Sequence, residues 1–83
     1  MTKAVRRLSQ MDLAIFRFVA DYIEQNSIPP SIRDIEVGLN ISSTSVVRYR
    51  LNHLVKTGYI GKQPKIARGL KVLAWPRELR QPA

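Results

Sequence analysis

Residues 42–60 read SSTSVVRYRLNHLVKTGYI, and this stretch decides the fold. Its apolar side chains recur at spacings of 4, 3 and 1, which gathers them on one side of an α-helix. These apolar residues are Val47, Leu51, Leu54 and Val55. Ser42, Ser43 and Thr44 are alternative caps for the start of the helix, and Gly58 suits its end. The stretch therefore predicts a helix that buries one side and exposes the other.

Two further helices are predicted before this stretch. Ser9, with Asp12 three residues later, has the spacing of a capping box, and a helical apolar pattern follows it over residues 10–26. A double proline at 29–30 interrupts the pattern, and a second Ser-x-x-Asp pair restarts it over residues 31–39. Asn40 follows, where a tight turn between helices needs a residue that tolerates the left-handed conformation.

Beyond Gly58 the pattern changes to short β-like segments. Residues 59–60 and 69–73 flank a polar loop at 61–68, which predicts a β-hairpin with a basic tip. The order helix, helix, turn, helix, hairpin is that of a winged helix. We therefore expect a mainly α (α+β) domain, a three-helix winged helix-turn-helix with a carboxyl-terminal β-hairpin wing.

The length of 83 residues allows one domain. We assign residues 1–8 to a basic amino-terminal arm, 9–73 to the winged helix and 74–83 to a short extension, in which Trp75 is expected to cover the edge of the core. The chain has no cysteine and one histidine, so we expect neither a metal nor a cofactor. Because no apolar run could span a bilayer, we expect a cytoplasmic, nucleoid-associated protein without a membrane partner.

The charge distribution favours a polyanionic partner for the carboxyl-terminal half. Lys and Arg number 14 against 6 Asp and Glu, which gives a net charge of +8. All acids except Glu78 lie within the first 36 residues. The bases between residues 37 and 77 are Arg48, Arg50, Lys56, Lys62, Lys65, Arg68, Lys71 and Arg77. The alternative is a basic surface that is merely solvated.

In a winged helix the last helix enters the major groove of DNA. The candidates for contact with base edges on this helix are Ser43, Ser45, Val46, Arg48, Tyr49 and Asn52. Arg48 is suited to guanine, Asn52 to adenine or a phosphate, and Val46 to a thymine methyl group. The alternative is that Ser43 only caps the helix, that Arg48 is solvated and that Tyr49 packs on a neighbour.

Basic residues outside the helix are candidates for contact with the DNA backbone. Lys62, Lys65 and Arg68 surround the predicted wing tip, where they could neutralise phosphates. Arg6 and Arg7 could form an arm over the backbone. These residues could equally serve solubility, or belong to a disordered basic start.

We expect no enzymatic activity. No serine, acid and histidine grouping is apparent around His53, so a structural or partly exposed histidine is favoured over a catalytic one. Stacking of Trp75 on a nucleotide base suits single strands better than a duplex.

Four segments together resemble the amino-terminal DNA-binding domain of the LexA repressor family. They are IPPSIRDI at 28–35, LNISS at 39–43, LNHLVKTGYI at 51–60 and ARGL at 67–70. The resemblance implies a winged helix that presents five positions to operator bases: Ser43, Ser45, Val46, Arg48 and Tyr49. Familiar members carry acids at the positions of Arg48 and Tyr49, and usually a glycine at that of Asn40. A different operator is therefore expected.

Full-length members of that family continue into a dimerising, self-cleaving domain, and the sequence after Leu73 is too short for one. We therefore expect a free-standing relative, an isolated domain or a truncated product. We expect a sequence-specific regulator of transcription that binds double-stranded DNA, a repressor without the self-cleaving domain, pairing as a homodimer on a palindromic operator. The alternatives are a winged-helix module for protein interaction and a non-specific DNA-binding protein.

Overall fold

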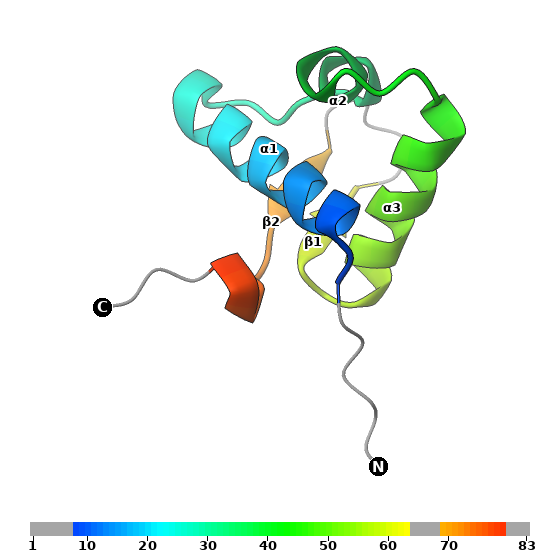
Figure 1. Cartoon of the computed structure of the whole chain (residues 1–83). Coiled ribbons are helices and arrows are strands. Elements are labelled where there is room, and N and C mark those ends of the chain that lie inside the picture. The colour runs from blue at the N-terminus through cyan, green and yellow to red at the C-terminus, as the bar shows by residue number, and fades with distance from the viewer. Residues whose placement is uncertain (1–7, 64–68, 80–83) are drawn as a thin grey trace.

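The computed structural model describes residues 8–63 and 69–79. Three α-helices come first in the chain: α1 (Gln10–Asn26), α2 (Ile32–Leu39) and α3 (Thr44–Lys56). They are followed by strands β1 (Ile60–Lys62) and β2 (Leu70–Val72) and by η1, a 3-10 helix at Arg77–Leu79. Figure 1 shows α1 crossing in front of the hairpin, with α2 at one end and α3 alongside. The predicted winged helix-turn-helix is confirmed.

Serine capping boxes begin α1 and α2, as the sequence predicts. At α1 the backbone N–H of Asp12 donates to Ser9 Oγ over 3.1 Å, and Ser9 N–H donates to Asp12 Oδ2 over 3.0 Å. Ser31 and Asp34 make the same two hydrogen bonds, also of 3.1 and 3.0 Å. These bonds satisfy amide groups that a helix start leaves without a partner.

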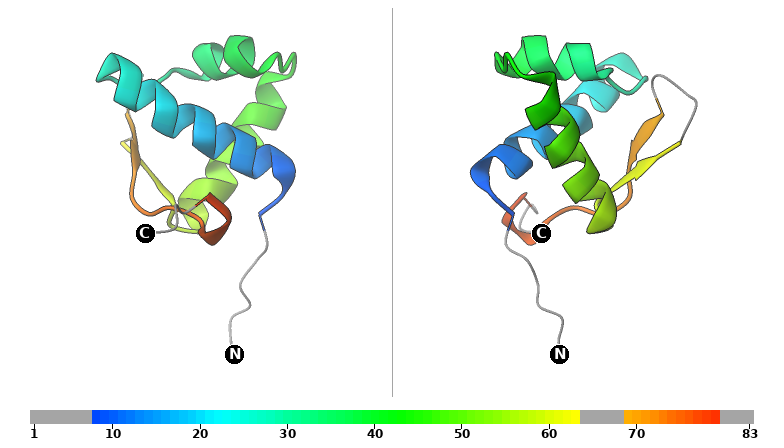
Figure 2. Two further views of the ribbon diagram at one scale, coloured as in Figure 1. Left: turned by 60° about the vertical axis from the view of Figure 1, so that its left-hand side comes forward. Right: turned by 90° about the vertical axis from the view of Figure 1, so that its right-hand side faces the viewer.

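A left-handed residue makes the turn between α2 and α3. Asn40 has φ 57° and ψ 44°, and its N–H donates back to the last turn of α2. The chain then reverses within a few residues, so that α3 leaves α2 at a steep angle (Figure 2). The predicted role of Asn40 is confirmed.

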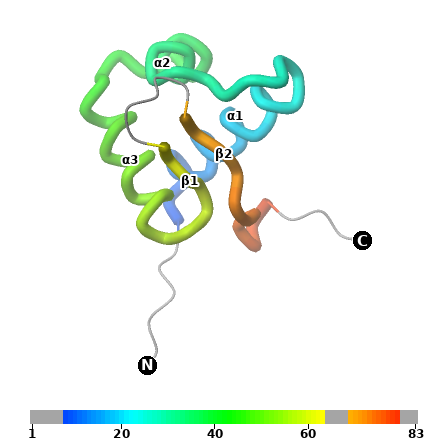
Figure 3. Tube along the Cα trace, turned by 180° about the vertical axis from the view of Figure 1, so that it is seen from behind, coloured from blue at the N-terminus to red at the C-terminus, as the bar shows by residue number. Residues whose placement is uncertain are grey.

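The hairpin closes the open side of the three helices. Its strands are antiparallel, with Ile60 opposite Val72 and Lys62 opposite Leu70. Strand β1 packs against α3 and β2 against α1, as the view from behind in Figure 3 shows. The predicted hairpin is confirmed with a shifted boundary. Tyr59 lies just before β1, and its carbonyl accepts the N–H groups of Leu73 over 2.9 Å and of Ala74 over 3.3 Å.

Every layer contributes to one core. Its side chains without exposed surface are Ile15, Phe16, Val19, Ile35, Val47, Leu54 and Ile60. The ring of Trp75 meets that of Phe16 edge to face, with centroids 5.1 Å apart, so Trp75 covers the edge of the core as expected. Pro76 is buried beside it, and η1 packs on α1. The sequence predicts no further element here, so η1 is a correction; the N–H of Leu79 donates to the Pro76 carbonyl over 2.9 Å to close its turn.

None of the helices within the described ranges has the length and apolar character of a membrane span.

Candidate nucleic-acid interface

Helix α3 has one side in the core and one side in solvent. Val47, Leu51 and Leu54 are buried, whereas Val55 is half-buried, so the apolar stripe is narrower than the sequence predicts. The exposed side carries polar, basic and aromatic residues: Ser45, Val46, Arg48, Tyr49, Asn52 and Lys56. No acid lies within α3. The predicted recognition residues of this helix thus share one solvent-facing surface.

Ser43 is the cap of α3, which decides between the three serine and threonine candidates. Its Oγ accepts a hydrogen bond of 3.3 Å from the N–H of Val46, and the residue is half-buried. Because the bond uses only a lone pair, the Ser43 hydroxyl retains its hydrogen as a donor.

A hydrogen bond between side chains ties α2 to the first turn of α3. Thr44 Oγ1 donates to the carboxylate of Glu36, on an exposed part of the surface. The first turn of α3 contains no acid of its own, so Glu36 places the negative charge that favours a helix start there. The two helices are thereby joined at the end where the recognition surface begins.

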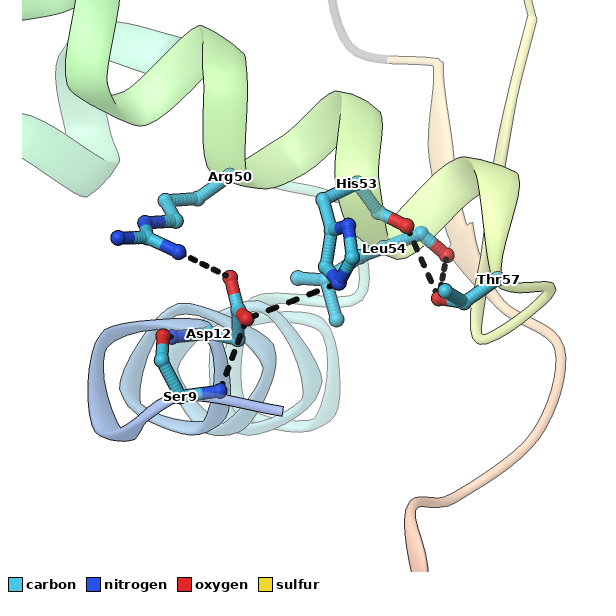
Figure 4. Close-up of polar contacts among 6 residues, drawn as sticks. All are labelled: Ser9, Asp12, Arg50, His53, Leu54 and Thr57. Carbon is cyan, nitrogen blue, oxygen red and sulfur yellow. Dashed lines mark hydrogen bonds and ion pairs between the residues drawn. The ribbon is translucent and has the colours of Figure 1, made fainter. Parts of the chain in front are cut away.

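The opposite flank of α3 holds a buried carboxylate between two basic side chains (Figure 4). Asp12 is 2% exposed, and its Oδ1 lies 3.6 Å from Arg50 Nη1. His53 Nε2 lies 3.9 Å from the Oδ2 of the same carboxylate. The first turn of α1 is thus attached to the middle of α3 through opposite charges.

This arrangement corrects the prediction that no acid and serine accompany His53. Asp12 and Ser9 are both nearby, but Ser9 Oγ accepts the Asp12 N–H in the capping box. The serine therefore acts as a cap, and the carboxylate faces Arg50 and His53. No three His, Asp or Glu side chains in the described ranges gather as a metal site would require.

The wing projects from the side of the helices (Figure 2). Lys62 is exposed at the end of β1, so it belongs to a strand and not to the loop that the sequence predicts. Gly69 lies opposite Gln63, whose N–H donates to the Gly69 carbonyl over 3.0 Å. A Cβ atom at Gly69 would lie 2.7 Å from the carbonyl oxygen of Gln63. The other proposed backbone contacts, Lys65, Arg68, Arg6 and Arg7, lie outside the described residues.

Sequence reasoning passed over Arg50, Asp12 and Glu36 as site residues. Arg50 falls between the buried and the exposed side of α3, so a helical pattern assigns it to neither. The capping box accounts for Asp12 in the sequence without any further role. Its burial depends on the packing of α1 against α3, which lies far away in the sequence. The sequence offered one signal: residues 37–77 contain no acid, so a carboxylate that pairs with the basic middle of α3 has to come from another part of the chain.

Comparison with known proteins identifies the family. The model of the LexA DNA binding domain matches residues 5–69 of the chain. The LexA repressor of Roseiflexus sp. (strain RS-1) is 41% identical over 66 residues, which cover 80% of this chain and 30% of that protein. The LexA repressor of Herpetosiphon aurantiacus is 39% identical over 66 residues, covering 80% and 31%. That of Carboxydothermus hydrogenoformans is 36% identical over 67 residues, covering 81% and 33%.

The chain spans about a third of the length of these curated relatives. The family match nevertheless includes all three helices and the first strand of the wing. The winged helix-turn-helix fold of the chain and the polar, basic exposed side of α3 agree with that match. The chain therefore belongs to the family of LexA DNA-binding domains.

Proposed function

We propose that this chain binds double-stranded DNA sequence-specifically through α3 and acts as the DNA-binding part of a transcriptional repressor. The observation that carries the proposal is the solvent-facing side of α3, which combines hydrogen-bond donors, acceptors and positive charge without an acid. Membership in a family of DNA-binding domains supports it, as do relatives named repressors.

In this proposal α3 lies in the major groove with its amino-terminal half toward the base edges. Arg48 has two donors in the geometry that guanine O6 and N7 accept, and the methyl groups of Val46 suit a thymine methyl. Ser43 and Ser45 lie near the helix start, where hydroxyl and amide donors meet phosphates or bases. Asn52 is one turn further along and suits adenine or a phosphate.

Backbone contacts hold α3 in register. Lys62 lies at the exposed end of β1, and the proposal adds Lys65 and Arg68 of the wing and Arg6 and Arg7 before α1. Such contacts release counterions and position the domain without reading sequence. We propose that these residues contribute mainly to the affinity for DNA, and that the residues of α3 determine which sequence is bound.

Repression follows from occupancy, because a protein bound over a promoter excludes the polymerase. A single domain of this size reads a short site, so we propose that two copies bind the halves of a palindromic operator. The role is one of binding and includes no catalytic step. Binding to chromosomal DNA would place the protein at the nucleoid in the cytoplasm.

Selection from a randomised duplex library, with the purified chain as the probe, tests the proposal. Selected and scrambled duplexes are then titrated over a range of salt concentrations. We expect one enriched motif, bound about a thousandfold more tightly than scrambled duplex. Equal, salt-sensitive binding to both duplexes would show a non-specific binder, and salt-insensitive binding to neither would favour a module for protein interaction.

A further inference from the structure

Arg50 links the buried carboxylate of α1 to an exposed aromatic ring of α3. Its Nη1 faces Asp12 Oδ1 at 3.6 Å, and its Cζ lies 5.4 Å from the centre of the Tyr49 ring. The Arg50 side chain is 32% exposed, whereas Asp12 is 2% exposed. Arg50 therefore has one edge toward the protein interior and one face toward Tyr49.

Neighbouring residues on a helix do not ordinarily face each other. The Arg50 side chain meets the Tyr49 ring because a planar guanidinium can pair with a carboxylate through its edge while its face covers an aromatic ring. Tyr49 itself is 65% exposed. Arg50 thus contacts one side of the Tyr49 ring, and the rest of the ring is exposed on the surface that we assign to DNA binding.

We propose that Arg50 is a positioning residue for base recognition, which Asp12 holds in place and which restricts the orientation of the Tyr49 ring. The inference rests on the proposed function, in which Tyr49 meets base edges. An exposed side chain that is already oriented loses less conformational freedom when it meets its partner. Arg50 therefore raises the contribution of Tyr49 to base preference without touching a base.

A direct phosphate contact by Arg50 is the competing role. The pairing with Asp12 argues against it, because the carboxylate balances the positive charge that a phosphate would need. His53 faces the same carboxylate from α3, with its Nε2 3.9 Å from Asp12 Oδ2, so both side chains of this flank point toward Asp12. Positioning also predicts a local effect, whereas loss of a phosphate contact weakens binding to all sequences alike.

The test measures affinity for every single-base-pair variant of the selected duplex with the wild type, Arg50→Met, Tyr49→Ala and the double variant. Arg50→Met keeps a long apolar side chain and removes the guanidinium. We expect Arg50→Met to reduce base preference by about two- to fivefold, and only at the base pair whose preference Tyr49→Ala also reduces. In the Tyr49→Ala background, Arg50→Met should change preference no further.

Arg50→Lys is the second variant and guards against a folding defect in Arg50→Met. It keeps a positive charge for Asp12 but lacks the planar guanidinium face. Its free energy of unfolding should therefore stay close to that of the wild type, while it loses the same base preference as Arg50→Met. The unfolding transition of each variant is recorded by circular dichroism. A wild-type preference profile in Arg50→Lys would overturn the inference.

Three other results would also overturn it. They are an equal loss at all base pairs in Arg50→Met, a reduced salt dependence of its binding, and a Tyr49→Ala variant with unchanged preference. If the wild type itself shows no base preference, the proposed function falls and the inference with it. A wild type with a clear motif and unaltered Arg50 variants would remove the inference alone.

Discussion

Replacement of Asp12 by alanine should destabilise the domain more than an ordinary loss of a helix cap. Removal of the capping interaction costs about 1 kcal/mol. Breaking a buried ion pair by removing one partner costs about 3–5 kcal/mol where the remaining charge is cut off from water. Here Arg50 is 32% exposed and the charged atoms are 3.6 Å apart, which lowers this contribution to about 1–2 kcal/mol. We therefore expect Asp12→Ala to lose about 2–3 kcal/mol of unfolding free energy.

Two companion variants separate the contributions. Ser9→Ala removes the hydroxyl acceptor of the cap and should lose about 1 kcal/mol. Asp12→Asn keeps an oxygen acceptor for the Ser9 N–H and removes the charge, so it should lose about 1–2 kcal/mol. The measurement is urea-induced unfolding followed by circular dichroism, with equal slopes across the variants. The reasoning is refuted if Asp12→Ala costs no more than Ser9→Ala.

Three further variants test the turn, the wing and the α2–α3 link. Asn40→Ala should lose about 1 kcal/mol of stability because of its left-handed backbone, and Asn40→Gly should stay within about 0.5 kcal/mol of the wild type, both measured by urea unfolding. Gly69→Ala should lose about 1–3 kcal/mol, because its Cβ would press on the Gln63 carbonyl, and hydrogen exchange at the Gln63 amide should accelerate. Glu36→Gln keeps an acceptor for Thr44 and removes a negative charge near the recognition surface. Fluorescence anisotropy should show roughly two- to fivefold tighter binding to scrambled duplex, and a weaker or unchanged affinity would contradict this reasoning.

Local sequence signals explain why the helices could be predicted so closely. The start of α1 follows from the Ser9 cap, and its end comes at the left-handed Ser27, two residues before the double proline that predicts the interruption. The strand bounds depend on pairing across the hairpin, which a local pattern does not contain. The sequence therefore predicted the first strand at residues 59–60, whereas β1 spans Ile60–Lys62. The 3-10 helix η1 spans only three residues, which is too short for a periodic apolar pattern to predict it.

In the candidate interface, too, local features could be predicted from the sequence and contacts between distant residues could not. The exposure of Arg48, Tyr49 and Asn52 follows from the helical period, because the buried stripe leaves them only the other side. The pairing of Arg50 with Asp12 could not be predicted, since it joins two helices far apart in the sequence. It also decides which arginine of α3 faces the interior and which remains available to DNA.

A comparison of Arg48→Ala with Lys62→Ala tests whether the exposed side of α3 reads bases. Affinity is measured for the selected duplex and for each of its single-base-pair variants, at several salt concentrations. We expect Arg48→Ala to lose about 1–3 kcal/mol of discrimination at one base pair, and Lys62→Ala to weaken binding to all duplexes alike and lower the salt slope by about one. Parallel profiles for the two variants, with every base preference retained, would contradict this expectation.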